Sequence, residues 1–269
     1  MNISRFFKLS AVIAGTGMAV GEDRPRPAWL SPGQARRLDP LALQACAAVD
    51  RLLIGCAPLA PDTALVLGTA WGCVASTQRF LDGISTYGES GSSPTAFTIS
   101  VHHHVAGVLG ELLHLHGPAT TVCAGNRSGL TALRSAALML AAGRAPAVLV
   151  VVADQANALM RRMVPALAQT PWPLGEGAVA LLLKSAGPGR HVSFVAQAAE
   201  LVVDAGGVSP GEERALLRAA RGQERRCAAA LHGAWWPTAA LAAVPWDDPR
   251  PVLVREIDKG QVLEAWLTL

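Results

Sequence analysis

The sequence predicts an α/β protein with a largely parallel sheet, and three observations support this fold class. Unbroken apolar runs recur along the chain, as in AVLVVVAD at 147–154 and AVALLLK at 178–184. Such runs are typical of central strands that are buried on both faces. Segments with apolar residues at helical spacing lie between the runs, and glycine and proline mark the junctions. Strands that alternate with helices favour a parallel sheet, because parallel neighbours need a crossover connection.

The individual elements follow from the same patterns in chain order. A helix is expected over 36–53, where Leu41, Ala45 and Ala48 lie on one face. Another is expected over 102–115, because Gly117-Pro118 supplies a glycine cap followed by a proline. The other elements expected up to about Ala142 are a strand with a glycine turn at 9–20, a loop at 21–34, strands at 63–69 and 120–123, a short helix at 76–84, a turn-rich loop at 87–97 and a long helix from Ser128.

The signal for regular structure is weaker after about Lys184. Helices are expected at 212–220 and over 235–244. The final segment, 251–269, has two apolar runs around Asp258-Lys259-Gly260, and this pattern predicts two strands joined by a turn.

Composition excludes several classes of protein. The chain has 269 residues, of which 51% are hydrophobic and 16% charged, so it is globular and leans apolar. A net charge of +3, scattered arginines and few aromatic residues do not fit nucleic-acid binding. No segment reaches the roughly 18 apolar residues of a membrane span. An apolar chain with few charges suggests that part of its surface is covered by a partner.

Cysteine usage and the N-terminus point to a cytoplasmic protein. The five cysteines are widely spaced and form no CxxC, which is typical of reduced thiols. The first twenty residues resemble a signal peptide, with basic residues before an apolar run. A buried first strand is favoured instead, because Gly15 and Gly17 interrupt the run.

Two motifs resemble a cofactor-binding or metal-binding site, but each departs from what such a site requires. GTGMAVG at 15–21 resembles a dinucleotide-binding loop, but Val20 stands where the fingerprint needs its last glycine. His102, His103 and His104, with His114 and His116, resemble a set of metal ligands, but three consecutive histidines at a helix start point in different directions and no HExxH is present. We therefore expect a polar helix cap or an interface loop there, and no cofactor or metal.

The segment TVCAGNRSGLTAL at 121–133 is the candidate site. It predicts a strand, a small turn and a helix, which is how many α/β enzymes mount a nucleophile. The turn holds Asn126, whose amide is no nucleophile. Cys123 lies earlier, within the expected strand, and is interpreted as a small buried thiol. A reactive Cys123 near a helix N-terminus is the alternative.

Taken together, these segments resemble the β-ketoacyl synthases of the thiolase superfamily. The matching segments, in the family's order over about residues 9–187, are AVIAGTGMAVG, RRLDPLALQACAAVDRLL, LVLGTAWGCVASTQRFLDGI, SPTAFTISVHHHVAGVLGELLHLHGPATTV, SGLTALRSAALMLAAGRAPAVLVVVAD and LGEGAVALLLKSAG. The resemblance implies a thiolase-like, layered α/β/α architecture. It also implies a complete N-terminal half at 1–187 and a reduced C-terminal half at 188–269, both packed into one globular unit.

The resemblance also implies that the catalytic groups are missing. Aligning Ser128-Gly129-Leu130 with the family places Asn126 at the position of the nucleophilic cysteine, whereas Cys123 falls three residues early. No segment after residue 187 resembles the family's histidine motif, and His232 lies in a different context. Such a protein resembles the chain-length factors, non-catalytic homologues that pair with an active ketosynthase, and its short second half resembles the versions in aryl-polyene clusters.

This resemblance implies a partner interface and a role. In the superfamily, the strand before the nucleophile pairs with its copy across a dimer, which here means Thr120, Thr121, Val122 and Cys123. The preceding loop, with Phe97, Val101 and His103, would reach toward the partner's acyl tunnel. The predicted function is a subunit that heterodimerises with a ketosynthase and shapes its tunnel, with acyl carrier protein contacting it only indirectly. The alternative is a diverged acyltransferase or thioesterase that uses Cys123 with one of His102–His104.

Overall fold

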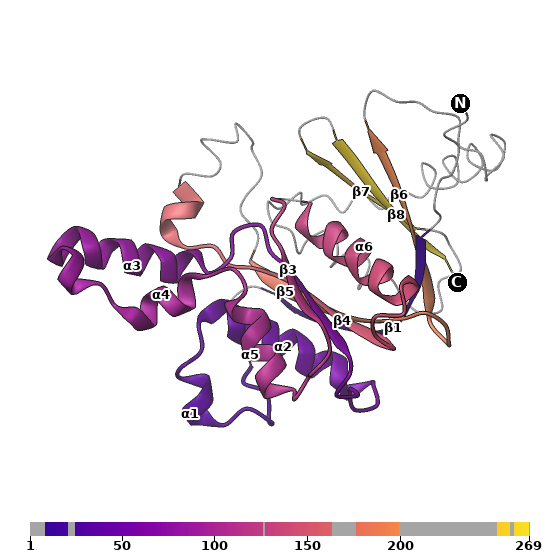
Figure 1. Ribbon diagram of the computed structural model, residues 1–269, viewed down its shortest axis with the longest axis horizontal. Helices are drawn as coiled ribbons and strands as arrows, with labels where there is room; N and C mark the ends of the chain where they lie inside the picture. Colours follow the sequence, from indigo (N-terminus) through magenta and orange to yellow (C-terminus); the bar gives the residue numbers. More distant parts are fainter. Residues whose placement is uncertain are drawn as a thin grey trace.

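A sheet of eight strands organises the part of the chain that the structure describes. The computed structural model describes residues 9–20, 25–125, 127–162, 176–198, 252–258 and 261–268. The strand order is β3-β2-β4-β5-β1-β6-β8-β7 (Figure 1). The strands are β1 (Leu9–Val20), β2 (Ala64–Gly68), β3 (Ala119–Val122), β4 (Ala147–Asp154), β5 (Gly177–Lys184), β6 (Arg190–Ala198), β7 (Val252–Asp258) and β8 (Gln261–Thr268).

The sheet is mixed, so the prediction of a largely parallel sheet is wrong. Only β2 pairs in parallel with its two neighbours, β3 and β4. The pairs β4–β5, β5–β1, β1–β6, β6–β8 and β8–β7 are antiparallel. One short connection explains part of this result, because the two residues between β7 and β8 are too few for a parallel crossover.

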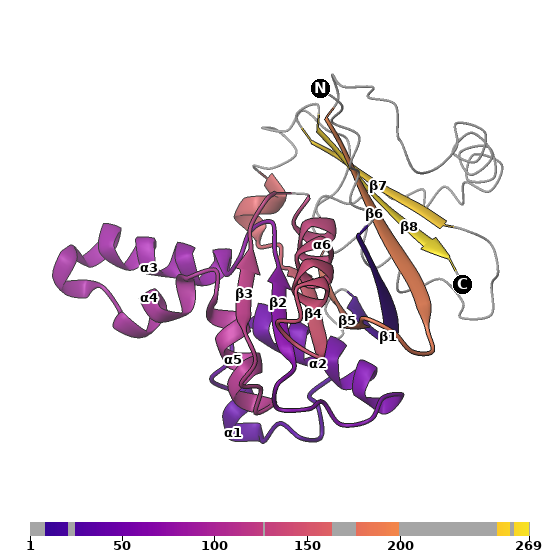
Figure 2. The ribbon, with the colours of Figure 1, turned by 45° about the vertical axis from the view of Figure 1, so that its right-hand side comes forward.

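Helices cover both faces of the sheet and give it three layers. Helices α2 and α5 pack on one face, and α6 packs on the other (Figure 2). This arrangement confirms the predicted layered α/β/α architecture. The helices are α1 (Pro32–Ala35), α2 (Pro40–Ile54), α3 (Val74–Tyr87), α4 (Pro94–Ser100), α5 (His104–Leu112) and α6 (Ser128–Ala141), with a 3₁₀ helix η1 (Glu89–Gly91) between α3 and α4.

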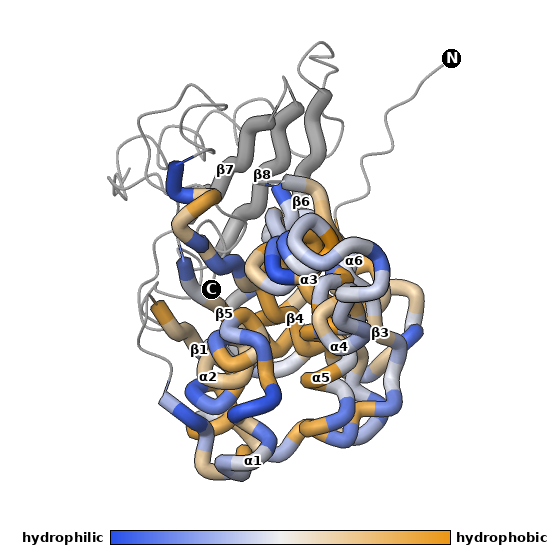
Figure 3. Tube along the Cα trace, turned by 90° about the vertical axis from the view of Figure 1, so that its left-hand side faces the viewer, coloured by the Kyte–Doolittle hydropathy of each residue, from blue (hydrophilic) through white to orange (hydrophobic). Residues whose placement is uncertain are grey.

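The core lies on both sides of β4 and β5, as the unbroken apolar runs predict. Along β4, Val148, Val150 and Val152 belong to the cluster under α6. The alternate residues Leu149 and Val151 belong to the cluster under α2 and α5. All five are fully buried, because successive side chains of a strand point to opposite faces. The hydrophobic part of the trace in Figure 3 gathers at these central strands.

Several helix and strand boundaries differ from the expectation. Strand β1 continues through both glycines to Val20, because its pairing with β5 extends to that residue. Helix α4 occupies part of the predicted loop 87–97: Ser93 caps it, and Pro94 fixes its first turn. Strand β6 was not predicted. The final two strands are confirmed as β7 and β8, whereas the helices predicted at 212–220 and 235–244 lie outside the described residues.

Helices α3 and α4 form an arm, residues 74–100, that stands away from the layered body (Figures 1 and 2). Ser76 is the only buried residue of α3, and α4 has none. The rings of Phe80 and Phe97 contact each other between the two helices, with their centroids 5.4 Å apart. The arm therefore buries little apolar surface against the body.

Strands β6, β8 and β7 extend the same sheet beyond β1. In the register, Arg255 of β7 lies opposite Glu264 of β8. The sheet thus runs without interruption from the N-terminal strands into the end of the chain. A domain boundary near residue 187 and a reduced second half remain predictions.

Candidate functional site

The turn between β3 and α6 lies at the carboxyl edge of the parallel strands. Gly125 has a φ of 59°, a left-handed conformation that favours glycine. The buried hydroxyl of Ser128 braces the turn: it accepts from Ala124 N at 2.8 Å and donates to Gly125 O at 2.7 Å. Helix α6 begins at Ser128, as predicted. Asn126, the predicted degenerate nucleophile position, lies outside the described residues.

A buried carboxylate holds the neighbouring loop. Asp154 ends β4, and its Oδ1 accepts hydrogen bonds from Thr69 Oγ1 at 2.9 Å and from the backbone N–H groups of Ala70 and Trp71 at 2.8 and 3.2 Å. Thr69 Oγ1 also accepts from Gly72 N at 2.9 Å. Because β2, β3 and β4 are parallel, their carboxyl ends meet at this edge.

The role of Asp154 is not predicted from the sequence. The signal was present, since an acidic residue that ends an apolar run points to a buried carboxylate with specific partners. Its partners in the loop after β2 could not be found from spacing, because 84 residues separate Ala70 from Asp154.

The thiol of Cys123 lies within this arrangement but is poorly suited to be a nucleophile. Its Sγ donates to Ala70 O at 3.7 Å. Partial burial of the sulfur raises the pKa of the thiol, the charge of Asp154 raises it further, and a backbone hydrogen bond from Gly125 opposes both. The thiolate is the reactive form of cysteine, so these surroundings lower the reactivity of Cys123. Cys123 is nevertheless exposed, which corrects the interpretation of it as a buried thiol.

The histidine run lies between the arm and α5. His102 packs against Gly72, whose φ is 62°; a Cβ built there would come within 2.8 Å of the ring. His103 is exposed at the N-cap position of α5 and makes no side-chain capping bond. Burial lowers the pKa of His104, Asp39 opposes this, and His103 adds to it. Among the described residues, no three His, Cys, Asp or Glu side chains could hold a metal ion.

The predicted interface residues fall on two parts of the molecule. Thr120, Thr121 and Val122 lie on β3, which is an edge strand. Phe97 lies on α4 of the arm with 55% of its surface exposed. Val101, at the C-cap of α4, is half-buried and accepts a backbone bond from His104 N at 3.0 Å. Helix α5 contacts both α4 and β3 and so connects the two parts.

The strand order, the three layers and the strand–turn–helix at β3–α6 define a fold of the thiolase type. The family described as "Beta-ketoacyl synthase, N-terminal domain" matches residues 13–231. The chain belongs to this family. No curated protein sequence matches it. Within the described residues, no helix is long and apolar enough to cross a membrane.

Solved structures with the same fold include ketosynthase complexes. One is the ishigamide ketosynthase/chain length factor, with 22% identity and a TM-score of 0.71 over 97% of this chain and 99% of that one. Another is the ketosynthase ApeO with its chain length factor ApeC from Xenorhabdus doucetiae, with 17% identity and a TM-score of 0.62 over 96% and 99%. A third is a type II polyketide synthase carrier protein with its ketosynthase, with 13% identity and a TM-score of 0.71 over 97% and 99%.

Proposed function

We propose that this chain is a non-catalytic ketosynthase homologue of the chain-length-factor kind. It pairs with an active β-ketoacyl synthase and shapes that enzyme's acyl tunnel in polyene or polyketide biosynthesis. The observation that carries the proposal is the outer edge of β3, with which no other strand in the described part of the chain pairs. The carrier protein contacts mainly the active partner, because that subunit supplies the nucleophile.

The backbone of β3 has hydrogen-bonding groups that face away from the sheet. Leu65 N donates to Pro118 O at 2.9 Å, and Thr69 N donates to Val122 O at 3.0 Å. Backbone groups of a strand alternate in direction, so Pro118, Thr120 and Val122 face β2 and Thr121 faces outward. A second strand could therefore pair through Thr121 without disturbing the bonds to β2.

The side chains of β3 do not protect this edge. Strands at the edges of monomeric proteins are usually protected by charges, prolines or bulges. The strand Ala119–Val122 reads ATTV and has none of these within its bounds. Thr121 Oγ1 is also buried without a hydrogen-bond partner among the described residues. An uncharged, β-branched edge supports pairing with another chain by strand addition.

The arm supports the same assignment. Its large apolar side chains Leu81, Tyr87 and Phe97 are 56%, 72% and 55% exposed. An apolar protrusion of this kind is typical of a surface that a partner covers. In the proposed complex the arm reaches the partner's tunnel, where its side chains would limit the length of the growing acyl chain.

The carboxyl edge supports a role without catalysis. Its one described thiol, Cys123, has a pKa raised by burial and by Asp154, and donates to a carbonyl oxygen. An acyltransferase or thioesterase would need the opposite, a lowered thiol pKa beside a base. The solved complexes of ketosynthases with chain length factors share this fold and support a ketosynthase as the partner.

The first experiment is co-expression of the full chain with a ketosynthase encoded beside it, followed by affinity capture and size exclusion. A stable one-to-one complex is expected, and a monomer that ignores the ketosynthase would contradict the proposal. A thiol-directed acyl probe then separates the two candidate functions. Labelling of the partner alone is expected, whereas labelling of this chain that is lost in Cys123→Ala would favour the enzyme.

A further inference from the structure

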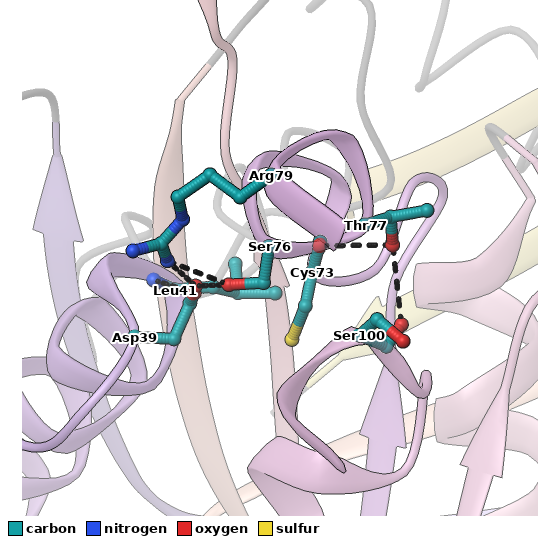
Figure 4. A network of polar contacts seen from close by, with 7 residues as sticks. All are labelled: Asp39, Leu41, Cys73, Ser76, Thr77, Arg79 and Ser100. Atoms are coloured by element: carbon teal, nitrogen blue, oxygen red, sulfur yellow. Dashed lines mark hydrogen bonds and ion pairs between the residues drawn. The ribbon is translucent and has the colours of Figure 1, made fainter. Parts of the chain in front are cut away.

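A buried polar cluster attaches the arm to the body (Figure 4). Asp39 precedes α2 and caps it, because its Oδ1 accepts from Leu41 N at 2.8 Å. Its other oxygen, Oδ2, accepts from Ser76 Oγ at 2.5 Å. Asp39 and Ser76 are 2% and 0% exposed. One carboxylate therefore connects the first turn of α2, in the body, to the first turn of α3, in the arm (Figure 4).

An arginine completes the cluster from the solvent side. Arg79 Nη2 donates to Ser76 Oγ at 2.9 Å and lies 3.8 Å from Asp39 Oδ2, while 66% of the arginine side chain is exposed. A buried carboxylate is costly unless hydrogen bonds and opposite charge compensate it. Ser76 and Arg79 both come from α3, so this compensation depends on where the arm lies.

The two helices of the arm are also linked to each other at the root of the arm, where α3 begins and α4 ends. Thr77 Oγ1 lies 3.2 Å from Cys73 O and 3.3 Å from Ser100 O (Figure 4). The hydroxyl thus links the first turn of α3 to the last residue of α4. Burial raises the pKa of the adjacent Cys73 to about 12, and the nearby charge of Asp39 contributes. Cys73 therefore stays a neutral thiol beside the carboxylate.

Beyond its root the arm has few other supports. Helix α3 packs mainly against α4 and η1, which belong to the arm itself. A second connection to the body is a neutral hydrogen bond, from Asn157 Nδ2 to Gln78 Oε1 at 2.8 Å. Val74 adds apolar contact with Ala156 and Met160. The charged, buried bond at Asp39 is the strongest of these connections, because hydrogen bonds to charged groups contribute about twice as much as neutral ones.

We propose that Asp39 is the positioning residue of the arm. Through Ser76 it sets the direction in which α3 and α4 leave the body, and it lets the arm stand as a rigid unit although almost none of its side chains are buried. Without this bond the arm moves about its root, while the sheet stays folded. The inference concerns the chain alone and does not rest on the proposed ketosynthase partner.

The test is hydrogen exchange of the full chain, followed by mass spectrometry of peptides. Ser76→Ala removes the link and leaves the Asp39 cap on α2 intact. We expect amides of the arm to exchange at least about tenfold faster, as loss of a hydrogen bond to a buried charge implies. Peptides of α6 should exchange at the wild-type rate. Unchanged exchange in the arm, or an equal rise in α6, would overturn the proposal.

Two matched variants sharpen the result. Ser135→Ala deletes the same hydroxyl in α6, where Ser135 Oγ donates to Thr131 O at 2.9 Å, and should leave the arm unchanged. Gln78→Ala removes the neutral connection and should accelerate exchange less than Ser76→Ala. An equal or larger effect of Gln78→Ala would contradict the special role of Asp39.

A second pair of substitutions remains informative if Ser76→Ala does not fold. Asp39→Asn keeps an oxygen for Leu41 N and an amide that can pair with Ser76, whereas Asp39→Ala keeps neither. Exchange in the arm should rise less in Asp39→Asn than in Asp39→Ala. Equal exchange in the two variants would show that the side-chain bonds of residue 39 do not hold the arm.

Discussion

The centre of the sheet and the arm are stabilised in opposite ways. Strands β4 and β5 bury their side chains on both faces, and three layers of structure hold them. The arm buries one residue, Ser76, and exposes large apolar side chains. The body therefore gains its stability from burial within this chain. The arm depends on the polar cluster of Asp39, Ser76 and Arg79, and it leaves apolar surface that a partner can cover.

Truncation of one leucine to alanine in each region should show this difference in stabilisation most strongly. Leu133 of α6 is fully buried, whereas Leu81 of the arm is 56% exposed. Leu133→Ala should lower the free energy of unfolding by about 2–5 kcal/mol, because it removes buried apolar contacts and leaves a cavity. Leu81→Ala should lower it by no more than about 0.5 kcal/mol. Urea denaturation of both variants checks this, and equal losses would show that the arm is as well packed as the body.

A second pair tests the close packing of α2 on β1. A Cβ at Gly17 would clash with backbone atoms of Ala48 and Leu52, while one at Gly107 in α5 would meet nothing within 4 Å. Gly17→Ala should cost about 1–3 kcal/mol through overpacking. Gly107→Ala should raise stability by up to about 1 kcal/mol, because alanine favours a helix. Thermal denaturation measures both, and a tolerated Gly17→Ala would mean that α2 is not fixed against β1.

Thiol reactivity distinguishes the site from the core. Burial raises the pKa of Cys46 and Cys73 to about 12 each, and burial with the charge of Asp154 raises that of Cys123. Alkylation of Cys123 should be slower than that of free cysteine at neutral pH and should increase as the pH rises, because the thiolate reacts. Cys46 and Cys73 should react more slowly still. Mass spectrometry of a pH series measures the rates, and fast labelling of Cys123 at neutral pH would support the catalytic alternative.

The smallest expected effect is on the pH dependence of the free energy of unfolding, through His104 at the junction of arm and body. Burial lowers its pKa in the folded chain, so the unfolded chain binds a proton first as the pH falls below the ordinary histidine value of about 6.5. The free energy of unfolding should therefore decrease as the pH falls below about 6.5, down to the folded pKa. His104→Gln should reduce this slope, because the glutamine side chain does not take up a proton in this pH range. Denaturation midpoints between pH 7 and 5 measure it, and an unchanged slope would assign the acid sensitivity elsewhere.

The sequence predicted the body of the fold better than the arm, for a physical reason. Apolar runs mark the strands β2, β4 and β5 because both of their faces are buried. The arm has no such signal, since its helix α4 buries nothing and is specified only by Ser93 and Pro94 at its start. The parallel prediction failed because periodicity reports burial and not strand direction.

The same distinction applies to the candidate site. The start of α6 at Ser128 follows from a local pattern and was predicted. The contacts of Asp154 with the loop after β2 and of Asp39 with Ser76 join residues far apart in the chain, so no local pattern encodes them. The placement of β3 at the edge of the sheet came from the resemblance to ketosynthases and not from its residues.

The proposed pairing of β3 with a ketosynthase can be tested at Thr121, whose backbone faces outward from the sheet. Thr121→Pro removes an outward N–H without touching the bonds of β3 to β2, while Thr121→Val keeps the backbone and the branched side chain. Each variant is co-expressed with the ketosynthase, and the complex is measured by size exclusion with light scattering. We expect Thr121→Val to retain the one-to-one complex and Thr121→Pro to lose it while remaining folded. A complex that survives Thr121→Pro unchanged would contradict pairing through this edge.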